Sequence, residues 1–336
     1  MSKIPTDLTR HTLNGPTMGT RWSAQFYAPA ATDPDPIHAG LAESVHVVDR
    51  QMSTWKPDSD LMRLNRAAVG TSVPVPTELM EVLVRALEIG RLSGGAFDIG
   101  VGDVVTAWGF GPGDADESAM RQALSRTRPV AHEVLELDRV SLCVRKQAPI
   151  ALDLSGIAKG YAVDRMLAVL GRFGIANALV GLDGEMRARG LRPDGRPWAI
   201  ALERPDYEKR VALSILELED AAVATSGDYR HWVDIGGQRF SHTIDPARGV
   251  PLSGTLASVT VLAETCMDAD AWATALMVLG VRSGTELAKK LRLNAIFIER
   301  TNEVLRQRQV GWIHGNDRLT KILNREEKPR SLICLG

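Results

Sequence analysis

Apolar and polar side chains alternate along many short segments of this chain, which is the pattern of strands with one buried face. Between residues 176 and 227 these segments follow one another with short connections, as in an antiparallel sheet. The pattern predicts strands at 20–28, 176–190, 197–203, 211–219, 221–227, 257–264 and 294–300, and a strand pair over 141–155.

Apolar residues recur at helical spacing in a second set of segments, most of them longer. Gly94 and Gly174 stand at the ends of two of them, where glycine commonly terminates a helix. Residues 95–117 are rich in glycine and are expected to form loops. The spacing predicts helices at 37–53, 77–93, 156–174, 266–280 and 285–292.

The order of these elements predicts the fold class. Clusters of strands mixed with long helices, and few regular βαβ alternations, favour an α+β fold over a doubly wound sheet. The chain has 336 residues, which is enough for one large domain with a buried core. We expect a loose N-terminal arm at 1–16, the folded domain at 17–312, and a polar tail or edge element at 313–336.

Composition and charge narrow the classes of function. The formal net charge of -1 offers no basic surface for a polyanion, so nucleic acid is not an expected partner. The three cysteines are too sparse and too widely spaced for a disulfide framework or a zinc cluster, which predicts free thiols in a reducing compartment: Cys143, Cys266 and Cys334.

The hydropathy of the chain also bears on its location. No apolar run approaches the ~20 residues of a membrane span. The N-terminus shows no apolar stretch of signal-peptide length. As written, the protein is expected to be cytoplasmic, and it would be periplasmic if an export signal is missing from the sequence.

The segment "ALDLSGIAKGYAVD" joins a short apolar strand to a helix and is the first candidate for chemistry. The first backbone N–H groups of a helix have no intrahelical partner and often bind an anion. Asp153 lies next to this potential anion site. Lys159 lies in the first helical turn, where a cation is unfavourable for the helix dipole. Either Ser155 caps the helix and Lys159 is solvated, or Lys159 has a negatively charged partner at a binding site.

The segment "DADAWATALMVLG" places Asp270 and Thr274 four residues apart on one face of a predicted helix. Their oxygens can together face a hard cation such as Mg²⁺, while Asp268 points elsewhere. The alternative is local, because Asp270 favours a helix N-terminus and Thr274 can bond back to its own helix.

Two further segments carry candidate residues. In "GGAFDIGVGD", Phe97 can pack on a planar ring system or fill the core, which is the commoner fate of phenylalanine. In "SHTIDPARG", Pro246 restricts the turn that follows His242, and Asp245 could orient the imidazole. Histidine titrates near neutral pH and suits general-base work, although a histidine beside a turn is also commonly structural.

Seven motifs in one order closely resemble the ApbE family, the Mg²⁺-dependent FAD:protein FMN transferases. The resemblance runs from Met18 to the strand near Phe297. The motifs are "MGT" (18–20), "MSTWKPDSDLMRLN" (52–65), "GGAFDIGVG" (94–102), "LDLSGIAKGYAVD" (152–164), "VATSGDYR" (223–230), "SHTIDPARG" (241–249) and "DADAWATAL" (268–276).

This resemblance implies a T-fold-like α+β structure with duplicated antiparallel sheets and an FAD site between two lobes. It implies transfer of FMN from FAD to a Thr or Ser hydroxyl of a target protein, which forms a phosphoester and releases AMP. His242 would be the base, and Mg²⁺ would be held by Asp270, Thr274 and a backbone oxygen near Gly156. The residues similar to those of the flavin site are Met18, Trp55, Ala96, Phe97, Asp98, Asp153 and Lys159, and Thr243 or Ile244 should contact the flavin as well. Trp55 and Phe97 are expected to lie beside the bound flavin ring.

The chain departs from the family pattern at one turn, which reads "GLDGEM" with Asp183 where a glycine is expected. Aspartate tolerates a positive φ better than most residues, so we expect a local adjustment. Two alternatives to the transferase stay open: an Mg²⁺-dependent FAD pyrophosphatase that gives FMN and AMP, and a non-catalytic FAD-binding protein. The chain contains no Asp-x-x-(Ser/Thr)-Gly-Ala-(Thr/Ser) acceptor motif, so we do not expect it to flavinylate itself.

Overall fold

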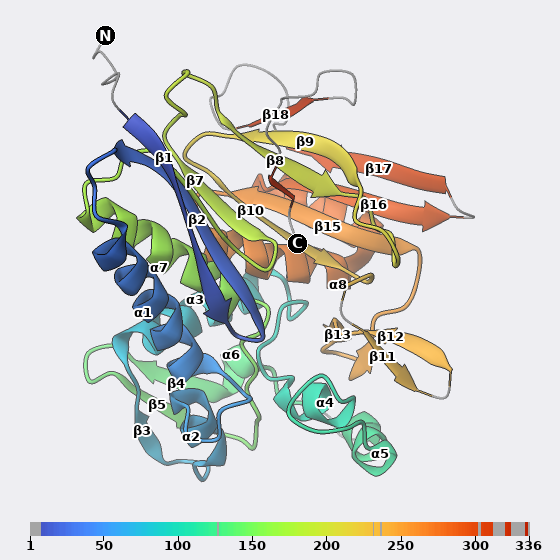
Figure 1. Cartoon of the computed structure of the whole chain (residues 1–336). Coiled ribbons are helices and arrows are strands. Elements are labelled where there is room, and N and C mark those ends of the chain that lie inside the picture. Colours follow the sequence, from blue (N-terminus) through green and yellow to red (C-terminus); the bar gives the residue numbers. More distant parts are fainter. Residues whose placement is uncertain are drawn as a thin grey trace.

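A central antiparallel sheet of eight strands organises the protein (Figure 1). The computed structural model describes residues 8–125, 128–230, 232–235, 237–301, 304–311, 320–323 and 333–334. In spatial order the strands are β1 (Leu8–Thr17), β2 (Thr20–Pro29), β6 (Ala178–Leu182), β7 (Glu185–Arg189), β10 (Ala222–Gly227), β15 (Leu256–Ala263), β16 (Asn294–Thr301) and β17 (Val304–Val310).

The two faces of this sheet bury two different hydrophobic cores. In β16, Phe297 belongs to the larger core, whereas its neighbours Ile296 and Ile298 belong to the second. Successive side chains of a strand point to opposite faces, so the alternation seen in the sequence builds a three-layered molecule.

Helices cover the larger core, as Figure 1 shows for α7 (Ala158–Arg172) and α8 (Cys266–Leu291). Helix α1 (Pro34–Met52) packs on α7. The second core lies under a smaller sheet, whose order is β18 (Thr320–Leu323), β9 (Ala212–Leu218), β8 (Trp198–Glu203) and β19 (Ile333–Cys334).

The remaining elements flank these layers at the lower part of Figure 1. One group consists of α2 (Asp60–Arg66), α3 (Thr77–Leu92), α6 (Ala131–Val134) and the small sheet of β3 (Ser72–Pro74), β5 (Cys143–Lys146) and β4 (Leu135–Asp138). The other consists of α4 (Gly102–Ala107), α5 (Glu117–Ser125) and two hairpins, β11 (Trp232–Ile235) with β12 (Gln238–Ser241), and β13 (Ile244–Asp245) with β14 (Val250–Pro251).

The predicted α+β class with antiparallel sheets is confirmed. The two helices predicted at 266–280 and 285–292 form one element, α8, which is broken at Gly280 (φ 72°, ψ 178°). That backbone conformation is open almost only to glycine, which explains why the helical spacing is interrupted there. Within the described residues, no helix is both long and apolar enough to cross a membrane.

Several boundaries differ from the predictions. The loose arm expected at 1–16 is wrong for residues 8–16, because β1 pairs with β2 along its whole length. Residues 1–7 lie outside the described part of the chain. The strand pair expected over 141–155 is also wrong in its second half, since β5 pairs with β3 and β4 instead.

The ends of the remaining predicted segments can also be compared. The glycine-rich loop at 95–117 contains the short helix α4. Of the predicted tail, β18 and β19 are strands at the two edges of the smaller sheet, and its other residues lie outside the described ones. The division of the chain into an arm, a two-lobed domain and a tail otherwise stays a prediction.

Candidate active site

Two large cavities meet where the N-terminus of α7 approaches the segment after β12. Their volumes are about 520 Å³ and 680 Å³, and both are lined by Ser155, Lys159 and His242. Of the predicted site residues, Met18 and Trp55 line the larger cavity. The others line the smaller one: Ala96, Phe97, Asp98, Asp153, Gly156, Lys159, His242, Thr243, Ile244, Asp270 and Thr274.

Asp153 forms the entry to α7. Its Oδ1 accepts a hydrogen bond of 2.8 Å from the backbone N–H of Ser155, whereas its buried Oδ2 has no hydrogen-bond partner among the described residues. Burial raises the pKa of this carboxyl group. The residue before α7 is Ile157, and no side chain caps the helix there, so the cap by Ser155 that one of the two alternatives required is not formed. An unpartnered buried oxygen in a cavity wall is suited to accept a hydrogen bond from a ligand.

Lys159 has negatively charged partners and is not a solvated surface residue. Its Nζ lies 2.9 Å from Oε1 of Glu185 and 3.1 Å from Oδ2 of Asp183. Burial opposes the charged form, but the charges of Glu185 and Asp183 outweigh it and hold the pKa of Lys159 above its ordinary value. Asp183 has a φ of 52°, so the turn that departs from the family pattern keeps the left-handed conformation.

The candidate cation ligands meet where α8 crosses α7. Oδ2 of Asp270 accepts a hydrogen bond of 3.0 Å from the backbone N–H of Gly160. Oγ1 of Thr274 forms a hydrogen bond of 3.1 Å with Oγ of Ser226 on β10. Thr274 therefore bonds to a different element, which differs from the alternative of a bond back to its own helix. A Cβ built at Gly156 would lie 3.2 Å from Oγ1 of Thr274, so the backbone of Gly156 lies against that hydroxyl.

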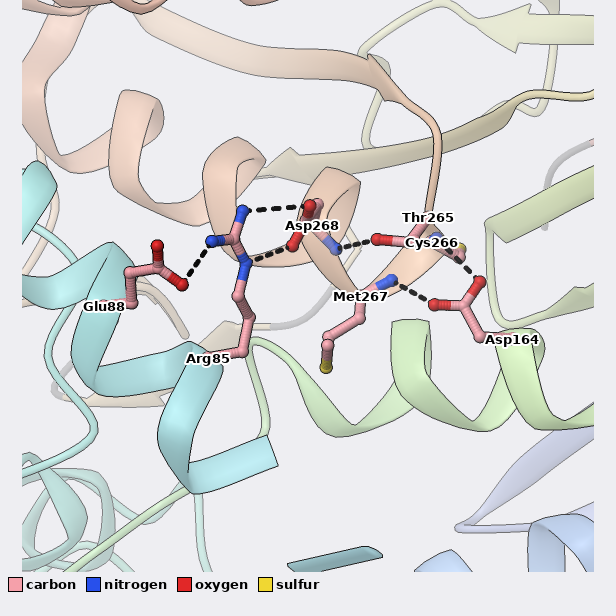
Figure 2. Close-up of polar contacts among 7 residues, drawn as sticks. All are labelled: Arg85, Glu88, Asp164, Thr265, Cys266, Met267 and Asp268. Atoms are coloured by element: carbon pink, nitrogen blue, oxygen red, sulfur yellow. Dashed lines mark hydrogen bonds and ion pairs between the residues drawn. The ribbon is translucent and has the colours of Figure 1, made fainter. Parts of the chain in front are cut away.

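The first turn of α8 is fixed by contacts with neighbouring helices (Figure 2). The carboxylate of Asp164 on α7 accepts hydrogen bonds of 2.8 Å and 2.9 Å from the backbone N–H groups of Cys266 and Met267. Arg85 of α3 donates two bonds, of 2.6 Å and 3.0 Å, to Asp268. Asp268 therefore points away from the cavity, as predicted, and the turn that carries Asp270 is held in place.

The segment that holds His242 is also shaped by local bonds. Oδ1 of Asp245 accepts hydrogen bonds of 3.0 Å and 3.1 Å from the backbone N–H groups of Ala247 and Arg248. Gly249 closes this turn with a φ of 64° and donates its N–H to the carbonyl of Asp245. Asp245 therefore shapes the turn that follows His242. The orientation of the imidazole by Asp245 stays a prediction.

The residues around Asp270 fit a hard cation. A carboxylate, a hydroxyl and a backbone carbonyl are oxygen ligands of the kind that Mg²⁺ binds, and Mg²⁺ usually keeps water or substrate oxygens as further ligands. Burial raises the pKa of Asp270 to about 6, which a bound cation would counteract. Among the described residues, no three or more Asp, Glu, His or Cys side chains are grouped as a metal site. The candidate ligand set is of another kind, because it contains one carboxylate, one hydroxyl and one backbone carbonyl.

Some residues at this junction were not predicted from the sequence. Glu185, Thr225, Ser226 and Arg230 also line the smaller cavity. The last three belong to the "VATSGDYR" motif, so the motif contained the signal without indicating which side chains face the cavity. Glu185 follows the turn at Asp183, and only the pairing of β6 with β7 brings it to Lys159.

Comparison with known proteins finds similar proteins over most of the chain. The ApbE family matches residues 18–297. The chain is 37% identical to a Vibrio cholerae FAD:protein FMN transferase over 87% of this chain and 88% of that protein. The fold resembles the solved flavin transferase ApbE from Vibrio cholerae (TM-score 0.79, 34% identity, 90% of this chain and 97% of that chain). It equally resembles the Pseudomonas stutzeri flavinyl transferase ApbE in its apo form (TM-score 0.79, 31% identity, 91% and 96%).

Proposed function

The chain belongs to the ApbE family, and from this premise we propose that it is an FAD:protein FMN transferase. One observation carries the proposal: two cavities of ligand size meet at Lys159 and His242. FAD has the matching construction, because two planar ring systems are joined by a pyrophosphate.

The proposal assigns one end of FAD to each cavity. Trp55 is 63% exposed at the larger cavity, where its indole can cover the isoalloxazine ring. Phe97 is buried in the wall of the smaller cavity. Asp153 lines the same cavity, and its unpartnered oxygen can accept a hydrogen bond from the amino group of adenine. Trp55 and Phe97 would then contact the two ends of FAD instead of flanking one ring.

The pyrophosphate would lie at the junction of the cavities. Lys159 supplies positive charge there, and Asp183 and Glu185 hold its ammonium group in position. Asp270, Thr274 and the backbone carbonyl of Gly156 would hold Mg²⁺. When bound, Mg²⁺ offsets negative charge on the pyrophosphate oxygens and on the departing AMP.

The proposed reaction is a displacement at phosphorus. The oxygen of a Ser or Thr hydroxyl in the target protein bonds to the phosphorus of the FMN half. The bond from that phosphorus to the bridging oxygen breaks, and the electron pair leaves with AMP. His242 accepts the hydroxyl proton, while Lys159 and the fixed geometry supply the positioning and charge stabilisation on which phosphoryl transfer depends.

Incubation with FAD, Mg²⁺ and a peptide that contains the acceptor motif tests this function. Flavin fluorescence on the peptide after denaturing electrophoresis is the expected result. If FMN and AMP form while the peptide stays unlabelled, the protein is the alternative FAD pyrophosphatase. If FAD is bound and stays intact with and without Mg²⁺, the protein is a non-catalytic FAD-binding protein.

A further inference from the structure

A third cavity, of about 140 Å³, reaches the junction from another side. It is lined by Lys159 and His242, which also line both larger cavities. Its other walls come from the turn between β6 and β7, from β7, β8 and β10, and from the segments that follow β8 and β10: Asp183, Gly184, Glu185, Glu203, Arg210, Thr225, Gly227, Tyr229 and Arg230.

We propose that this third cavity binds the hydroxyl-bearing side chain of the acceptor protein. The inference rests on the proposed function, in which the two ends of FAD fill the larger cavities. The attacking hydroxyl must then reach His242 by a path that FAD leaves open. The third cavity offers such a path, and its volume of about 140 Å³ is far smaller than that of either cavity assigned to FAD.

The inner wall of this cavity is polar and fixed. Nε of Arg230 donates a hydrogen bond of 3.0 Å to Glu203, and the guanidinium lies 5.0 Å from the centre of the Tyr229 ring. Burial raises the pKa of Tyr229 to about 12, so its hydroxyl stays protonated at neutral pH. A Cβ at Gly227 would lie 2.5 Å from the Tyr229 ring, so glycine is what allows the ring to take this place.

Arg210 provides the cation at the mouth of the cavity. Lys159 is paired with Asp183 and Glu185, and Arg230 is paired with Glu203, so those charges are largely balanced within the wall. The side chain of Arg210 is exposed, and it forms no ion pair in the part of the chain that the structure describes. It can therefore donate hydrogen bonds to carbonyl or carboxylate oxygens of the incoming segment.

Kinetics of Arg210→Ala with the acceptor-motif peptide test the inference. The KM for the peptide is expected to rise about fivefold, as for the loss of one exposed charged contact. The kcat, the Kd for FAD and the rate of FAD hydrolysis without peptide are expected to stay at wild-type values. Lys209→Ala is the matched control, because Lys209 is an exposed neighbour that does not line the cavity.

The outcomes separate this inference from the proposed function. If the wild type labels the peptide and Arg210→Ala has the wild-type KM, the acceptor does not enter at this cavity, although the transferase function stands. The same conclusion follows if Lys209→Ala raises KM as much as Arg210→Ala. If the wild type labels no peptide, both the proposed function and this inference are wrong.

Discussion

Asp270 on α8 accepts a hydrogen bond of 3.0 Å from the backbone N–H of Gly160 on α7. This bond joins the helix that carries the candidate cation ligands to the helix that carries Lys159. It also uses only Oδ2 of Asp270, so the other carboxylate oxygen can bind a cation. The relative position of α7 and α8 therefore determines whether Lys159 and the candidate cation ligands face the same ligand.

Asp270→Ala is expected to abolish Mg²⁺-dependent FMN transfer, because the set of oxygen ligands loses its only carboxylate. The measurement is the rate of peptide labelling as a function of Mg²⁺ concentration. Asp270→Asn is the structural control, since its amide oxygen can still accept the bond from Gly160. Undiminished turnover in Asp270→Ala would remove this residue from the metal site.

His242→Ala is expected to slow peptide labelling by about 10²- to 10⁴-fold, which is the usual contribution of a general base. Fluorescence titration should give an FAD affinity close to that of the wild type, since the ring systems would lie in the two cavities on either side of His242. If labelling proceeds at the wild-type rate, the assignment of His242 as the base is wrong.

Asp164→Ala is expected to destabilise the protein through the first turn of α8 (Figure 2). The substitution removes the acceptor of two backbone amides and the partner of Arg187, whose Nη1 lies 2.6 Å from Oδ1 of Asp164. The loss should be about 2 kcal/mol in the free energy of unfolding, measured by urea denaturation.

The Mg²⁺ concentration needed for half-maximal labelling should rise in Asp164→Ala as well, because Asp270 is carried by the same helix. Glu88→Ala is the matched control, since Glu88 makes a more exposed contact with Arg85 and is expected to change stability by less than about 0.5 kcal/mol. Equal effects of the two substitutions would contradict a positioning role for Asp164.

The sequence predicted the central part of the sheet and many of the residues that line the cavities, and its failures have physical causes. Strands such as β15 and β16 were found because their alternating side chains enter two buried cores. Strand β1 was missed because it is an edge strand, and most of its residues are exposed or half-buried, which leaves little hydrophobic pattern.

The local spacing of residues in the sequence could not predict contacts between distant segments. Arg85 and Asp268 are 183 residues apart, and their bond depends on how α3 packs beside α8. The separation of Trp55 and Phe97 into two cavities likewise depends on the tertiary packing of their segments. Motif order pointed to residues that line the two cavities, but only the fold shows which of them share a wall.

Gly160→Ala is expected to destabilise the crossing of α7 and α8. A Cβ there would lie 2.3 Å from the carbonyl oxygen of Cys266 and 2.8 Å from Cβ of Asp270, so the two helices must move apart. Overpacking of this kind typically costs about 1–3 kcal/mol, which outweighs the higher helix propensity of alanine. Thermal or urea unfolding measures the change.

Gly171→Ala, in the same helix, is the control for the Gly160 substitution. A Cβ at Gly171 would meet only the end of the Arg189 side chain, at 2.7 Å, and that flexible group can turn away. Gly171→Ala should therefore be neutral or stabilising. Comparable destabilisation by both substitutions would indicate that α7 resists any added methyl group and that the α7–α8 crossing is not special.

Glu185 makes the stability of the metal-free protein depend on pH. Burial raises its pKa from the ordinary 4.5 to about 8, although the charge of Lys159 acts in the opposite direction. Between these values the folded protein retains a proton that the unfolded chain has released, so the contribution of Glu185 to stability is greatest below pH 4.5 and is lost as the pH rises toward 8. While Glu185 is protonated, Asp183 remains the charged partner of Lys159. The slope for this one group is at most about 1.4 kcal/mol per pH unit.

Comparison of the wild type with Glu185→Gln isolates this contribution, because glutamine has a similar shape and stays neutral. The free energy of unfolding in EDTA, measured by urea denaturation at several pH values between 5 and 8, should fall more steeply for the wild type. The raised pKa of Lys159 lies above this window. Asp270, whose pKa burial raises to about 6, titrates in both proteins, so only the additional slope of the wild type is assigned to Glu185. Parallel curves for the two proteins would show that Glu185 is already ionised at pH 5, with Lys159 outweighing burial.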